Sequence, residues 1–102
     1  MADEQQPIQE RLSVRFEGRV QGVGFRATVA DIAVGFQVTG RVCNVLDGSV
    51  DLQAEGTEED LLRLMAAIEQ RLDRYIIDAH LRWHPISQAQ WTDFSIGTDL
   101  PR

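Results

Sequence analysis

The sequence predicts an α+β fold in which one sheet is covered by two helices. Three features predict it: stretches that alternate apolar and polar residues, stretches with apolar residues at helical spacing, and an Asp-Gly turn between two strands. The chain has 102 residues, 43% of them hydrophobic, which suits one domain with its own core. We expect a single domain over residues 11–102, preceded by a flexible acidic tail over residues 1–10.

The first predicted strand leads through a loop into a helix. Residues 12–17 alternate, so their apolar members face the core from one side of a strand. Residues 18–24 contain three glycines and are expected to form a loop. From Phe25 onward, apolar residues recur at helical spacing, which predicts an amphipathic helix of about three turns that ends near Gly35 or Gln37.

Two further strands and a second helix are predicted next. Residues 38–45 and 49–55 are expected to be strands, joined through the turn at Asp47-Gly48. Thr57 is the expected N-cap of the helix, because the acidic residues after it suit the positive end of the helix dipole. The buried stripe of this helix is Leu61, Leu64, Met65, Ile68 and Leu72.

A long strand is expected near the end of the chain. Residues 75–84 alternate, and Pro85 is expected to end the strand because it has no N–H to donate. A short strand around Phe94 and Ile96 is expected to follow. The order β-α-β-β-α-β is the split βαβ, or ferredoxin-like, two-layer sandwich: an antiparallel sheet with both helices on one face. The core face of residues 75–84 is expected to carry Ile77, Ala79, Leu81 and Trp83.

Charge is distributed unevenly along the chain. The net charge is −6, which argues against nucleic acid as a partner. Residues 11–41 nevertheless carry five arginines and only two acidic residues, a local balance of +3. This segment is therefore expected to attract a small anionic ligand. Its arginines are Arg11, Arg15, Arg19, Arg26 and Arg41.

Several features indicate a cytoplasmic protein. No apolar run approaches the ~20 residues that a membrane span needs, and residues 1–10 lack the basic and apolar regions of a signal peptide. The single cysteine, Cys43, cannot form an internal disulfide, which suits a reducing compartment. We expect a monomer that has neither a membrane nor a nucleic-acid partner.

Residues 18–26 join the first strand to the first helix and carry the candidate chemistry. A helix N-terminus offers unpaired N–H groups and a partial positive charge, and glycines let the backbone curl around an anion. Arg26, in the first turn of the helix, can bind phosphate oxygens through bidentate, charge-assisted hydrogen bonds. The pattern matches neither a P-loop nor G-x-G-x-x-G. On the residues alone, a phosphate site and an ordinary turn both remain open.

Two motifs resemble the signatures of the acylphosphatase family. Residues 20–26, VQGVGFR, resemble V-Q-G-V-x-F-R, and residues 40–50, GRVCNVLDGSV, resemble G-x-V-x-N-x-x-D-G-x-V. The motifs stand at the family's spacing, and the resemblance covers residues 12–98.

The resemblance implies hydrolysis of acyl phosphates to a carboxylate and inorganic phosphate, with no metal or other cofactor. In the family, the loop amides and the arginine bind the phosphoryl group, and the asparagine positions the attacking water. Carried onto this chain, Arg26 and Asn44 are the expected catalytic residues. The expected phosphate-binding residues are Gln21, Gly22, Val23, Gly24, Phe25 and Arg26. Positioning and charge stabilisation suffice because an acyl phosphate already has a good leaving group.

The chain departs from the family pattern in three places, and other functions stay open. Arg41 stands where an aromatic residue is usual, Gln37 where a helix-ending glycine is frequent, and residues 27–30 are less polar or aromatic than in relatives. One alternative is a catalytically weak or inactive phosphate-binding module. A second is a domain like the acylphosphatase-like part of hydrogenase-maturation carbamoyltransferases. A third, single-stranded RNA binding, needs exposed aromatics that the predicted sheet does not offer.

Other candidate sites are rejected on spacing. Cys43 is followed six positions later by Ser49, where a cysteine-phosphatase loop needs arginine. His80 and His84 in one strand lie roughly 13 Å apart, too far for one metal ion, and indicate an exposed polar face. Acidic residues 58–60 indicate helix capping rather than a cation site.

Overall fold

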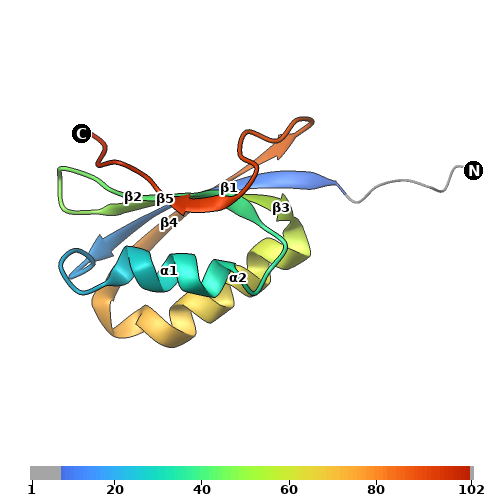
Figure 1. Cartoon of the computed structure of the whole chain (residues 1–102). Coiled ribbons are helices and arrows are strands. Elements are labelled where there is room, and N and C mark those ends of the chain that lie inside the picture. The colour runs from blue at the N-terminus through green and yellow to red at the C-terminus, as the bar shows by residue number, and fades with distance from the viewer. Residues whose placement is uncertain (1–7, 102) are drawn as a thin grey trace, which may run out of the picture.

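The computed structural model describes residues 8–101 and arranges them as one sheet with two helices on one of its faces (Figure 1). This is the predicted ferredoxin-like order with its additional strand. The strands are β1 (Gln9–Gly18), β2 (Thr39–Asn44), β3 (Val50–Thr57), β4 (Ile76–Ile86) and β5 (Phe94–Ile96). The helices are α1 (Phe25–Ala33) and α2 (Glu58–Leu72), with a 3-10 turn, η2 (Asp73–Tyr75), after α2.

The sheet has the strand order β4-β1-β3-β2-β5. Pairing is antiparallel between β1 and β3, β1 and β4, and β2 and β3, but β5 runs parallel to β2. The expected antiparallel sheet is therefore mixed at one edge. A parallel neighbour needs a long crossover, and the chain from the end of β2 to β5 supplies it through two strands and a helix.

The core lies between the sheet and the helices. Phe16 of β1 and Phe25 of α1 are both buried, with ring centroids 5.2 Å apart, so their contact packs the sheet against the first turn of α1. Burying one such side chain contributes about 1.5–3 kcal/mol. The predicted stripe of α2 is buried as expected: Leu61, Leu64, Met65, Ile68 and Leu72.

Local signals set the helix ends. The Thr57 side chain accepts a hydrogen bond from the Asp60 backbone N–H at 3.1 Å, as expected of an N-cap. Helix α1 ends at Ala33, slightly before the expected Gly35, because the chain then tightens into turns in which Gly35 N–H donates to the Ile32 carbonyl.

The strand β4 differs from its prediction in length and burial. It continues through Pro85 to Ile86, which is possible because β4 is an edge strand and Pro85 needs no partner on its open side. Ile77, Leu81 and Trp83 were expected in the core but are 83%, 41% and 36% exposed. Leu81 and Trp83 lie at an edge of the sheet, where fewer elements pack over them. Ile77 is left out of the ladder by the register shift beside Gly18, and Ile76 packs against the core in its place.

The expected tail over residues 1–10 is only partly described. Residues 1–7 lie outside the described residues, whereas Gln9 and Glu10 belong to β1 and pair with Thr57 and Gly56 of β3. Within residues 8–101, no helix has both the length and the apolar character that crossing a membrane would require.

Candidate active site

The glycine-rich loop between β1 and α1 curls at two left-handed glycines. Gly22 and Gly24 both have φ of 78°, a conformation that residues with a Cβ rarely adopt. Gly24 is also the N-cap of α1, and no side chain caps this helix end. The first amide N–H groups of α1 are therefore available to an anion, and its first turn contains no acidic residue to oppose one.

Arg26 and Asn44 meet at this loop. Arg26 lies in the first turn of α1, and Asn44 is the last residue of β2. Both line one cavity of about 190 Å³, called the cradle below. Its lining residues are Val20, Gly22, Gly24, Phe25, Arg26, Ala27, Asn44 and Ile96. None of these side chains is a carboxylate, imidazole or thiol, so the donor set suits an anion and not a metal cation.

The side-chain oxygen of Asn44 is buried and unpartnered. Among the described residues, no group donates a hydrogen bond to Asn44 Oδ1. An unsatisfied buried acceptor costs about 1–3 kcal/mol, and such groups concentrate at functional sites. Arg26 and Asn44 are the two residues with polar side chains in the lining of the cavity, so a small side-chain rotation of Asn44 would let Oδ1 accept a hydrogen bond from a water beside Arg26.

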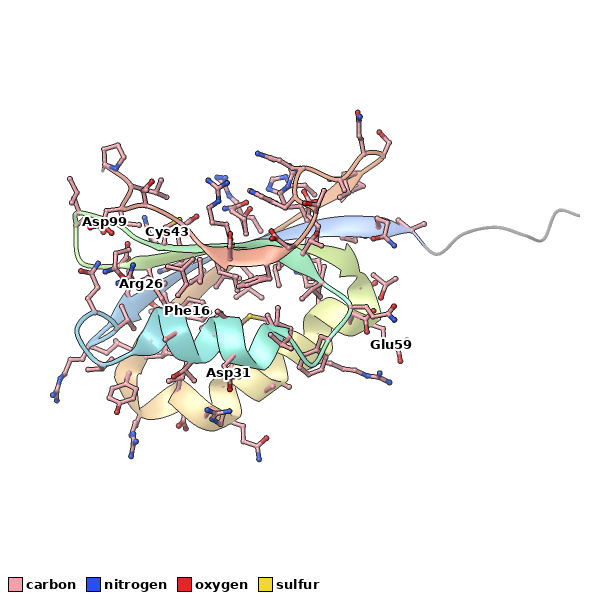
Figure 2. The ribbon with its side chains drawn as sticks, in the orientation of Figure 1. Phe16, Arg26, Asp31, Cys43, Glu59 and Asp99 are labelled. Atoms are coloured by element: carbon pink, nitrogen blue, oxygen red, sulfur yellow. The ribbon has the colours of Figure 1, made fainter. Side chains whose placement is uncertain are left out.

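The segment after β5 lies next to two residues of the cradle, Arg26 and Asn44. Leu100 N–H donates to the Asn44 carbonyl at 2.8 Å, and the Asp99 carboxylate lies 4.0 Å from the Arg26 guanidinium. Figure 2 shows Arg26 and Asp99 at the same end of the sheet. Sequence reasoning missed Asp99 and Ile96, because only the parallel pairing of β5 with β2 brings them to the loop.

Two residues of the expected phosphate set do not line the cradle. The Gln21 side-chain amide donates to the carbonyls of Val45 and Ser49, both at 2.8 Å, and so fastens the loop to the β2–β3 turn. Val23 packs against the hydrophobic core. Their side chains shape the loop, while Gly22, Gly24, Phe25 and Arg26 form the wall of the cavity.

The positive charge of residues 11–41 does not gather at the cradle. Arg11 is paired with the buried Glu55 at 2.8 Å, and Arg15 is paired with Glu17 at 3.2 Å. Arg41 packs over the Trp91 ring, 5.7 Å from its centroid. Of the five arginines, only Arg26 lines the cavity, so the local excess of charge was a poor guide to the site.

The departures from the family pattern are not equally close to the cradle. Neither Arg41 nor Gln37 lines it. Gln37 instead borders a separate hollow beside Trp91. Ala27, by contrast, contributes to the wall of the cradle.

Cys43 is buried beside the site. Burial raises the pKa of its thiol, against a smaller lowering by a backbone hydrogen bond from Gly97. A buried, protonated thiol is a poor nucleophile, which agrees with its rejection on spacing.

The fold and the cradle together define a class: a ferredoxin-like α+β protein with an anion site built from a glycine loop, a helix N-terminus and one arginine. Comparison with protein families gives the particular family. The acylphosphatase family model matches residues 12–96. The chain therefore belongs to the acylphosphatase family.

Individual relatives agree with this assignment. The chain is 51% identical over 53 residues to an acylphosphatase of Cupriavidus necator, a match that covers 52% of this chain and 58% of that protein. The aligned region thus spans little more than half of that relative. The crystal structure of acylphosphatase from Bacillus subtilis superposes with a TM-score of 0.76 at 30% identity, covering 86% of this chain and 98% of that one.

A larger protein contains a similar domain. Full-length HypF, crystallised in a phosphate- and nucleotide-bound form, matches with a TM-score of 0.76 at 26% identity. The match covers 94% of this chain but 13% of HypF.

Proposed function

We propose that this chain hydrolyses acyl phosphates to a carboxylate and inorganic phosphate. Arg26 and the N–H groups at the start of α1 bind the phosphoryl oxygens, and Asn44 orients the attacking water. Membership of the acylphosphatase family supports the reaction, and the cradle supports these roles.

The reaction is a displacement at phosphorus. The water oxygen forms a bond to phosphorus as the bond from phosphorus to the acyl oxygen breaks. The bonding electrons leave with the carboxylate, and the water protons remain on the resulting dihydrogen phosphate. Arg26 and the helix N-terminus stabilise the charge on the phosphoryl oxygens. Asn44 Oδ1 accepts one hydrogen bond from the water and so holds its lone pair toward phosphorus.

The observation that carries the proposal is the shared cavity of Arg26 and the unpartnered Asn44 Oδ1. Phosphoryl oxygens are bound mainly by hydrogen-bond donors, such as Arg26 and the amides of α1, whereas Asn44 Oδ1 is an acceptor. An acceptor beside a phosphate cradle suits a water that must be positioned.

The test is hydrolysis of benzoyl phosphate in EDTA, with inorganic phosphate as a competitive inhibitor. We expect Arg26→Ala to lower kcat/KM about 10²–10³-fold and to weaken phosphate inhibition, because it removes a charge-assisted clamp. We expect Asn44→Ala to lower kcat by about 10²-fold while the inhibition constant for phosphate stays within about threefold of the parent value.

Arg19→Ala is the matched control. Arg19 belongs to the same loop and carries the same charge, but it is exposed and does not line the cradle. We expect it to retain parental kinetics. If Arg19→Ala and Arg26→Ala lower kcat/KM equally, the effect comes from the net charge of the loop and not from a contact between Arg26 and the phosphoryl group. That result would contradict the role assigned to Arg26.

A catalytically weak phosphate-binding module is the second candidate, favoured by the position of Asp99. Its carboxylate already lies 4.0 Å from Arg26 and competes for the guanidinium. The same assay separates the two functions: phosphate binding without turnover would identify the binding module. A cytoplasmic location is part of the proposal, supported by the free thiol of Cys43.

A further inference from the structure

Three potential metal ligands converge on the sheet face opposite the helices. Glu17 of β1 and Asp78 and His80 of β4 each offer one ligand atom, and these atoms all lie within 4.8 Å of one another. His80 Nε2 lies 3.3 Å from Glu17 Oε1 and 3.7 Å from Asp78 Oδ2. A tetrahedral zinc ion with ligands at about 2.0–2.1 Å spaces its ligand atoms at about 3.3–3.4 Å. The His80–Glu17 distance already has this value, and the Asp78 carboxylate has to move closer for all three atoms to reach one ion.

The pairing of β1 with β4 places two carboxylates, those of Glu17 and Asp78, close together. Glu17 stands directly opposite Asp78 in the β1–β4 ladder, where paired residues point to the same face. Like charges in this position are destabilising. The ladder also shifts register beside this pair, between Glu17 and Gly18, and such bulges re-aim nearby side chains. A cation between the two carboxylates would remove the repulsion.

The ligand atoms are not fully occupied by other groups. Asp78 Oδ1 accepts from the Ala79 N–H, which leaves Oδ2 directed to His80. Glu17 Oε2 pairs with Arg15 at 3.2 Å, which leaves Oε1 directed to His80. Arg15 reduces the attraction for a cation but leaves both of the facing oxygens in place. All three side chains are roughly half exposed, so an ion can enter from solvent.

We propose that Glu17, Asp78 and His80 bind one Zn²⁺ ion, with water as the fourth ligand. The imidazole favours zinc over magnesium or calcium, which prefer sets made only of oxygen ligands. None of the three residues lines the cradle. The bound ion links β1 to the edge strand β4 and stabilises their pairing.

The second histidine of the chain provides a matched control. His84 lies on the same strand and faces the same side, but it stands opposite Arg11 and is not part of the cluster. Replacing either histidine with glutamine removes one imidazole from β4. Only the His80 replacement removes a ligand of the proposed site.

The experiment is isothermal titration of tag-free, full-length protein with zinc chloride in a buffer without chelators. We expect one equivalent of Zn²⁺ to bind the parent and His84→Gln equally. His80→Gln and Glu17→Gln should each bind at least tenfold more weakly. Zinc should also raise the Tm of the parent and of His84→Gln but not that of His80→Gln.

Three results would overturn the proposal. The first is the absence of zinc binding by the parent, and the second is zinc binding in His80→Gln at parental affinity. The third is an equal loss of affinity in His80→Gln and His84→Gln, which would show that zinc binds exposed histidines in general. Circular dichroism without metal shows whether His80→Gln folds. If it does not fold, Glu17→Gln is used in its place, and zinc binding by Glu17→Gln at parental affinity overturns the proposal. The readout is metal binding, whereas the hydrolysis assay is run in EDTA, so either hypothesis can fail without the other.

Discussion

Replacing Gly24 with alanine tests whether the loop conformation itself creates the anion site. Gly24 has φ 78° and ψ 19°, and an added Cβ would meet no atom within 4 Å. The cost of Gly24→Ala is therefore conformational and not steric. An L-residue in this region costs about 1–2 kcal/mol, and the reduced freedom of the unfolded chain returns about 0.4–1 kcal/mol.

The free energy of unfolding should fall by about 1 kcal/mol. For a domain of this size, that corresponds to a fall in Tm of about 4–8 °C. If the loop relaxes toward an ordinary conformation, the N–H groups of α1 turn away from the phosphoryl oxygens. Misplacement of this kind costs up to about 10²-fold in rate, so we expect kcat/KM for benzoyl phosphate to fall at least about tenfold.

Gly35→Ala is the control for the glycine substitution. Gly35 lies just after α1, outside the left-handed region, and its added Cβ would make only an ordinary contact, 3.5 Å from the Ile32 carbonyl. We expect parental activity and an unchanged or slightly higher Tm, measured by thermal unfolding. If Gly24→Ala matches Gly35→Ala in both Tm and kcat/KM, the left-handed turn is not what shapes the cradle.

Three further predictions follow from the charge and burial of individual side chains. Burial raises the pKa of Asp51, so its ionisation destabilises the fold as the pH rises through that raised pKa. Asp51→Asn should therefore raise the Tm at pH 7 and leave it unchanged near pH 3, and an equal gain at both pH values would contradict this cause. Asp99→Asn should tighten phosphate inhibition by up to about fivefold at low salt, because it releases a partly exposed ion pair of Arg26; weaker inhibition would show that Asp99 orients Arg26 instead. Cys43 should react with Ellman's reagent at least about tenfold more slowly in the folded protein than in denaturant, because its thiol is buried with a raised pKa; equal rates would refute that burial.

The element order and most of the core were predictable because they depend on local patterns. Alternation marked Leu12, Val14 and Phe16 as core residues of β1, and all three are buried. Helical spacing and an N-cap residue likewise marked the extent of α2. These signals act between residues close in sequence, so a single chain carries them without knowledge of its neighbours.

The exposure of β4 was not predictable from its alternation. Trp83 and Leu81 follow the pattern of a buried face, yet they are partly exposed because β4 is the edge strand. Strand order depends on pairing between distant segments, which alternation does not encode. The same limit hid the ligand cluster of His80, since only the register of β1 with β4 brings Glu17 to it.

By itself, the sequence determined the β-α-β-β-α-β order, the glycine-rich loop before α1, and the identity of Arg26 and Asn44 as candidate site residues. The tertiary structure decided that these two side chains share a cavity, that Asn44 Oδ1 has no donor among the described residues, and that Asp99 lies beside Arg26. The physical reason is the distance along the chain over which each kind of interaction acts. Local periodicity and turn chemistry act over a few residues, whereas the cradle is assembled from segments that meet only when β2 pairs with β3 and β5.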